Sequence, residues 1–124
     1  MKQALATEQA PAAIGPYSQG IAAGETVYVS GQLPLDPATG AFPEGIAAQT
    51  AQSLKNIRAI LAQQGMTLAN VVKTTVFLAD INDFAEMNKV YGEFFTQPYP
   101  ARSAVQVAKL PKDAPLEIEC IAVK

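Results

Sequence analysis

The fold of this chain is decided by residues 70–79, which read NVVKTTVFLA. These residues are mostly apolar or β-branched, so they predict a strand that is buried on much of both faces. A helical pattern precedes this strand and another follows it. Helices between strands imply crossover connections, and at least part of the sheet is therefore predicted to be parallel.

Each predicted helix carries one apolar stripe. From Gly45 to Gln64 apolar residues recur at spacings of three and four, and Gly65 follows as a C-cap. In the second helix Asn82 or Asp83 is the predicted cap, and Asp83 with Glu86 resembles a capping box. The stripe of that helix consists of Phe84, Met87, Tyr91 and Phe94.

Strands are expected on both sides of this central unit, in the order ββαβαββ. Residues 1–16 read as an irregular arm, because Pro11 and Gly15-Pro16 interrupt them. The expected strands span residues 17–23, residues 26–30 ending at Gly31, residues 102–109 and residues 116–123. The prediction is one α+β domain, residues 1–124, with a mixed sheet and two helices on one face.

The second face of that sheet lacks a cover. Two helices can cover only one face, yet the strands carry apolar residues on both sides. In the last strand Glu117 and Glu119 share their face with Ile121 and Val123. A second copy of the chain is the simplest cover, so the sequence predicts a homo-oligomer.

The composition excludes several reaction classes. The 124 residues include no histidine and one cysteine, Cys120, so zinc hydrolysis and Ser-His-Asp or Cys-His catalysis lack their ligands or base. No glycine-rich phosphate or dinucleotide motif is present. The net charge of -2 gives no electrostatic reason to bind nucleic acid or an anionic membrane. No run is long enough to span a membrane, and a lone cysteine favours a cytoplasmic location.

Arg102 is the strongest candidate for a binding residue. It is one of two arginines and begins a segment that otherwise reads as a buried strand. A guanidinium is costly to bury without an anion, and its planar fork of donors suits a carboxylate of the protein or of a ligand. The alternative is a surface arginine in an exposed ion pair, worth at most ~1 kcal/mol.

Other polar residues have two readings each. Glu117 and Glu119 point to the same side of the last strand, either as solvated edge charges or with a buried carboxylate facing a site. Ser30 could be a nucleophile or a strand hydroxyl, and the strand hydroxyl is favoured because no base is available. Tyr17 follows a Gly-Pro turn that could hold its ring, or it simply packs. Asn88 lies on a helix flank that ordinary solvation explains.

Six parts of the chain, in order and spacing, resemble the RidA/YjgF family of reactive-intermediate deaminases, also labelled the endoribonuclease L-PSP family. They are residues 10–20 (APAAIGPYSQG), 29–32 (VSGQ, with Pro34 and Gly40), 72–78 (VKTTVFL), 82–84 (NDF), 100–103 (PARS), and 110–113 with 117–119 (LPKD and EIE). The resemblance runs almost end to end.

The resemblance implies a chorismate-mutase-like fold and a homotrimer, with helices outside, sheets inside and a site in each cleft between subunits. The implied activity is hydrolysis of 2-imino acids and their enamine tautomers, of the 2-aminoacrylate and 2-iminobutanoate type. The products are a 2-oxo acid and ammonia, and no cofactor or metal is implied.

The resemblance also implies residue roles. Arg102 would clamp the substrate carboxylate, and Glu117 would orient water and carry a proton. The implied pocket residues are Tyr17 (reaching the neighbour's site), Ser30, Gly31, Phe84 and Asn88. Many relatives have cysteine where this chain has Ala104, whose carbonyl is implied to hold the water. The linker at residues 96–100 is shorter than is usual in the family, which could change the rim of the cleft and the size of the substrate side chain that it accepts.

Two other functions fit the family. An endoribonuclease or translation inhibitor would need a basic or aromatic RNA-facing surface, whereas the nine Lys and Arg residues are scattered and aromatic residues make up 7%. A non-catalytic 2-oxo-acid-binding protein would use the same arginine. The deaminase is preferred, with a small imino or oxo acid as partner and no nucleic acid.

Overall fold

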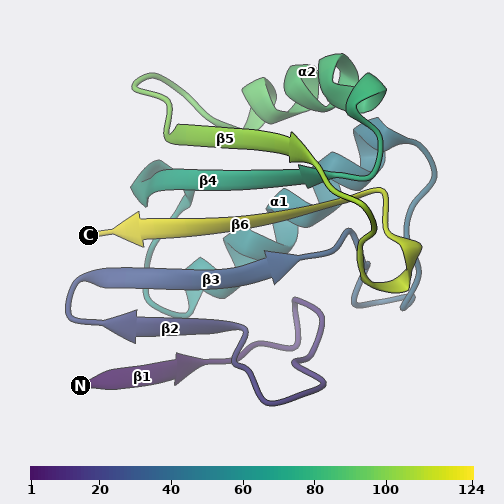
Figure 1. Cartoon of the computed structure of the whole chain (residues 1–124). Coiled ribbons are helices and arrows are strands. Elements are labelled where there is room, and N and C mark those ends of the chain that lie inside the picture. Colours follow the sequence, from purple (N-terminus) through teal and green to yellow (C-terminus); the bar gives the residue numbers. More distant parts are fainter.

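Six strands form one mixed sheet, in the order β1-β2-β3-β6-β4-β5, in a computed structural model that describes residues 1–124 (Figure 1). The strands are β1 (Lys2–Leu5), β2 (Gly20–Ala23), β3 (Thr26–Gln32), β4 (Val71–Leu78), β5 (Ala101–Gln106) and β6 (Leu116–Val123). Strands β4 and β5 pair in parallel, and every other pair is antiparallel. The predicted mixed sheet of an α+β fold is confirmed.

The helices α1 (Ile46–Ala62) and α2 (Phe84–Phe94) pack on one face of this sheet, as predicted (Figure 1). The stripe of α1 is the centre of the core, where Leu54, Ile60 and Leu61 have no exposed surface. On the sheet side the core residues alternate along the strands, as Leu116 and Ile118 do in β6. This alternation decides which side chains of each strand can reach solvent.

The other face of the sheet, here called the open face, is not covered within the protomer. Glu117, Glu119, Ile121 and Val123 of β6 lie on it, because the residues between them are buried under the helices. Tyr28 of β3 is 50% exposed on the same face. The expected uncovered face with mixed apolar and acidic residues is therefore present.

Several sequence expectations are wrong. The strand expected at residues 17–23 begins only at Gly20, and the strand expected at residues 102–109 spans Ala101–Gln106 and has no buried residue. Strand β4 is buried on one face, not on both.

The arm is not irregular throughout, because Lys2–Leu5 forms β1 on the edge of the sheet beside β2. Only Leu5 of that strand is buried, so its alternation is too short to detect. Gly31 does not end β3, which continues to Gln32 through an irregularity in its pairing with β6. The Asp83–Glu86 capping box does not form; Asp80 instead accepts a hydrogen bond from the Asn82 amide and starts a 3-10 turn before α2.

Neither helix has the length and apolar character that a membrane crossing requires.

Candidate active site

Arg102 lies on β5, the edge strand, and points toward α2. It is in register with Thr74 of β4, whose side chain is buried under that helix. Its guanidinium carbon is 4.7 Å from the centroid of the Tyr91 ring and 5.4 Å from that of Phe84. Nη1 donates a hydrogen bond of 2.7 Å to Oδ1 of Asn88. Two aromatic rings and one amide therefore hold the plane of the guanidinium in place.

No acidic side chain of the chain lies within ion-pair distance of this guanidinium. The protomer's one ion pair joins the exposed residues Lys109 and Asp113. A guanidinium has five N–H donors, and Asn88 accepts from only one nitrogen of Arg102. The remaining donors are held in a fixed direction and are available to an anion that the protomer itself does not supply.

Tyr91 supports this site in addition to belonging to the predicted core stripe of α2. Its hydroxyl is 2.7 Å from Oγ1 of Thr74, and both side chains are buried. Burial is the main cause that raises the pKa of Tyr91, so the phenol stays neutral beneath the cation. Its spacing in the sequence could have indicated this supporting role, because Tyr91 follows Asn88 by three residues and Phe84 by seven and so shares their helix face.

Ala104 lies two residues after Arg102 on the same side of β5. It is in register with Val76 of β4, and its methyl group packs against the core. Because β5 has no neighbour on its outer side, alternate backbone groups of this strand are not paired within the sheet. We call Arg102, Phe84, Asn88 and Ala104, with Tyr91 as their support, the arginine half-site.

Glu117 is on the opposite face of the sheet. Its neighbours in β6, Leu116 and Ile118, are fully buried under the helices, so Glu117 points to the open face. Its carboxyl group packs against Gly31, where an added Cβ would lie 2.7 Å from both Cδ and Oε2. Only a glycine leaves room for the carboxylate at that position. Partial burial raises the pKa of Glu117, and the nearby carboxylate of Glu119 raises it further.

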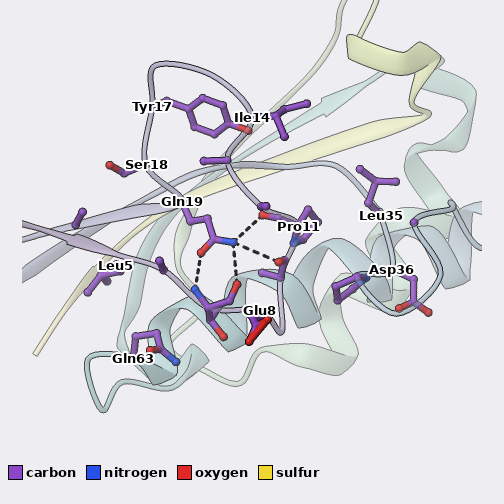
Figure 2. Close-up of a pocket in the computed structure, with 18 of the residues that line it drawn as sticks. Leu5, Glu8, Pro11, Ile14, Tyr17, Ser18, Gln19, Leu35, Asp36 and Gln63 are labelled. Atoms are coloured by element: carbon purple, nitrogen blue, oxygen red, sulfur yellow. Dashed lines mark hydrogen bonds between the residues drawn. The ribbon is translucent and has the colours of Figure 1, made fainter.

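Ser30 lies next to Gly31 in β3, and Tyr17 belongs to the loop to which Ser30 is hydrogen-bonded. The Ser30 hydroxyl donates to the Ser18 carbonyl at 2.6 Å, and the Ser30 amide donates to the Gln19 carbonyl at 2.9 Å. These bonds fix the chain segment that carries Tyr17 next to Ser30 and Gly31. Tyr17, 52% exposed, lines an open pocket of about 1090 Å³ between residues 4–19 and the loop at 35–40 (Figure 2). We call Tyr17, Ser30, Gly31 and Glu117 the glutamate half-site.

The structure thus places the site residues expected from the sequence in two sets. Within one protomer Arg102 and Glu117 lie on opposite faces of the sheet and cannot contact one small molecule together. The structure contains no group of three or more His, Cys, Asp or Glu side chains that could hold a metal ion.

Comparison with known proteins identifies the family of this chain. Residues 7–124 match the family model described as endoribonuclease L-PSP. A 2-iminobutanoate/2-iminopropanoate deaminase of Salmonella typhimurium is 54% identical, with 100% of this chain and 99% of that protein aligned. Its Escherichia coli counterpart is 52% identical over the same shares.

Solved structures agree with this assignment over almost the whole chain. RidA from an Antarctic Psychrobacter species superposes with a TM-score of 0.95 at 49% identity, covering 98% of this chain and 99% of that one. Escherichia coli TdcF with bound serine gives a TM-score of 0.94 at 48% identity, covering 98% of both chains. From the matched motifs, the sheet and these relatives it follows that the chain belongs to the RidA/YjgF family, also called the endoribonuclease L-PSP family.

Proposed function

We propose that this protein is a 2-iminobutanoate/2-iminopropanoate deaminase, which hydrolyses small 2-imino acids to 2-oxo acids and ammonia. The single observation that carries the proposal is Arg102, held between two rings and an amide with no acidic partner in its protomer. Such a fork suits a small carboxylate. Two relatives that are 52–54% identical over the full chain carry this activity in their names.

The active site lies between protomers in this proposal. A small imino acid must reach both Arg102 and Glu117, which one protomer presents on opposite faces. A neighbouring copy can bring its arginine half-site against the glutamate half-site of the first. The uncovered open face, with Tyr28 half exposed and Ile121 partly exposed, supports such an assembly. The family resemblance favours a homotrimer.

The chemistry follows from the two half-sites. Arg102 binds the substrate carboxylate and so fixes the neighbouring C=N carbon. Water adds to that carbon while the imine nitrogen is protonated, which gives a carbinolamine. Glu117 takes that proton from the water and passes it to the nitrogen. It then carries the proton of the carbinolamine hydroxyl to the amino group, and ammonia leaves as the C=O bond forms. A carboxyl whose pKa is raised by burial holds a proton closer to neutral pH than an ordinary glutamate, which suits this exchange.

The remaining site residues have supporting roles. Phe84 and Asn88 form the wall beside the carboxylate, and Ser30 with Gly31 lines the Glu117 side. A carbonyl on the outer edge of β5, at Ala104, is available to hold the water. Tyr17 extends from the glutamate half-site toward the substrate's other end. Escherichia coli TdcF is a relative whose structure contains bound serine, a small amino acid of similar size.

The test couples the protein to a serine or threonine dehydratase and follows 2-oxo acid release while semicarbazide competes for the imine. We expect acceleration by the wild-type chain and none by Arg102→Ala or Glu117→Ala. Cleavage of labelled RNA would instead indicate an endoribonuclease. Binding of a 2-oxo acid without turnover would indicate a non-catalytic binding protein.

Mixing the two inactive variants tests where the site lies. If each site combines Arg102 of one chain with Glu117 of another, co-folded Arg102→Ala and Glu117→Ala chains regain intact sites. Random assembly of equal amounts gives about one quarter of the wild-type sites. If both residues act within one chain, the mixture stays inactive, and the inter-protomer proposal is wrong.

A further inference from the structure

The loop between β1 and β2, residues 6–19, has no regular secondary structure, yet it carries Tyr17. Its exposed tip contains Ile14, 76% exposed, and Tyr17, 52% exposed. Local bonds hold only small parts of it, such as the Tyr17 amide donating to the Gly15 carbonyl at 2.8 Å. A loop of this length without helix or strand needs another source of order if Tyr17 is to have one position.

The side chain of Gln19 supplies that order. It is 4% exposed, and its Oε1 accepts from the Thr7 amide at 2.7 Å. Its Nε2 lies 3.1 Å from the carbonyl of Thr7, 3.3 Å from that of Ala10 and 2.7 Å from that of Pro11 (Figure 2). One amide therefore contacts four backbone groups of the returning arm, and its two N–H donors serve three carbonyls, so one N–H is shared between two of them.

The main chain of Gln19 connects the same point to the glutamate half-site. Its carbonyl accepts from the Ser30 amide at 2.9 Å, next to the Ser18 carbonyl that accepts from the Ser30 hydroxyl. The side chain holds the arm on one side, and the backbone is tied to β3 on the other. Tyr17, two residues away, is fixed between these attachments.

We propose that Gln19 is a positioning residue for Tyr17 in the deaminase site, an inference that rests on the proposed function. Its side-chain bonds reach only Thr7, Ala10 and Pro11 of the arm, and none reaches α1 or α2. Removing the amide therefore releases the loop, including the buried residue Ala10, while the helices and the arginine half-site keep their contacts. Tyr17 then samples several positions, and the fraction of correctly assembled sites falls.

Gln19→Ala removes the whole side-chain network, and Gln19→Glu keeps the size but places an acceptor opposite three carbonyls. We expect kcat/KM for the imino acid to fall about tenfold or more in both variants. The matched control is Gln49→Ala, because Gln49 also donates to a loop carbonyl, that of Pro43, but in a loop outside either half-site. Gln49→Ala is expected to keep wild-type kcat/KM.

A double-mutant cycle separates positioning from a general structural effect. If Gln19 acts through Tyr17, Gln19→Ala causes no further loss of kcat/KM in a Tyr17→Ala background. An equal loss in both backgrounds, or wild-type activity of Gln19→Ala and Gln19→Glu, would overturn the inference.

Hydrogen exchange gives a readout that does not depend on turnover, so it distinguishes failure of this inference from failure of the deaminase proposal. The Thr7 and Tyr17 amides are both hydrogen-bonded in the wild-type loop. We expect both amides to exchange faster in Gln19→Ala, with amides of α1 and β6 unchanged. Wild-type protection of the Tyr17 amide in that variant would contradict the proposed role, whether or not the protein deaminates imines.

Discussion

Gly31→Ala is expected to displace the Glu117 carboxylate and leave the fold intact. A Cβ at residue 31 would lie 2.7 Å from Cδ and Oε2 of Glu117, whereas ordinary contact begins at 3.4 Å. The carboxyl group must therefore move by about 0.7 Å. Gly31 does not have a positive φ, so alanine is compatible with its backbone. The clash falls on the flexible end of a side chain at the open face, which can yield.

The size of the effect on catalysis follows from that displacement. A misplacement of about 1 Å in an active site can cost about 100-fold in rate, so we expect kcat to fall by roughly 10- to 100-fold. Thermodynamic stability should change little, because the side chain and not the backbone moves. A loss of about 1 kcal/mol, the lower end for overpacking, is the upper expectation.

Two other glycines provide matched controls for the same substitution. Gly92 is exposed on α2, and an added Cβ meets nothing within 4 Å. Gly92→Ala should raise the Tm, since alanine favours a helix by up to ~1 kcal/mol, and should leave kcat unchanged. At Gly20 the Cβ would lie 2.9 Å from Ile60 in the core, so Gly20→Ala should mainly lower the Tm.

The assay is dehydratase-coupled 2-oxo acid release, with thermal unfolding measured on the same samples. Full kcat in a well-folded Gly31→Ala protein would refute the reasoning, because it would show that the position of the Glu117 carboxylate is unimportant. A large drop in Tm, comparable to that of Gly20→Ala, would show that the backbone had moved instead of the carboxylate.

Four further predictions concern charge and ionisation. Arg102→Lys keeps the positive charge but loses the planar fork above the Tyr91 ring, so steady-state kinetics should show KM at least tenfold higher, and an unchanged KM would contradict the clamp. The Glu119 carboxylate helps to raise the pKa of Glu117, so Glu119→Gln should lower that pKa and move the acid limb of the kcat/KM–pH profile to lower pH. In the folded protein the pKa of Glu117 is above its ordinary 4.5, so ionisation of Glu117 lowers the stability of the fold as the pH rises above that value. Glu117→Gln cannot ionise, and it should therefore raise the Tm at neutral pH while turnover is lost. Burial raises the pKa of Cys120 to about 12, so at pH 8 a thiol reagent should react with it only in unfolded chains, and rapid labelling of the native protein would show that the core is open there.

The elements that sequence reasoning predicted well are those whose burial has a local period. The helix at residues 46–62 carries its apolar residues at a helical spacing. The strand at residues 71–78 is predicted from its run of apolar and β-branched residues, and in the protomer its burial alternates, with one face buried. The same argument placed Glu117 and Glu119 on the face away from the buried residues of β6. Such patterns depend on neighbouring residues and need no knowledge of long-range pairing.

The features that sequence reasoning missed depend on contacts far along the chain. Strand β1 exists because its backbone pairs with β2, and only Leu5 of its four residues is buried. The face to which Arg102 points is set by its register with Thr74. Strand β5 has no buried residue in the protomer, so its own sequence contains no alternation from which that direction could be predicted.

The placement of Arg102 and Glu117 on opposite faces of the sheet also affects how the proposed site would control the protonation of Glu117. In the protomer, burial and Glu119 already raise the pKa of Glu117 while the open face is uncovered. In the proposed assembly, a second copy on that face would remove more water from the carboxyl group and raise the pKa of Glu117 further. In the inter-protomer site proposed above, the Arg102 guanidinium of that second copy would stabilise the Glu117 carboxylate and so act in the opposite direction. A substrate carboxylate that neutralised this guanidinium would remove the opposing effect, so in the proposed site binding of the acid would favour the protonated glutamate that donates to the leaving amine.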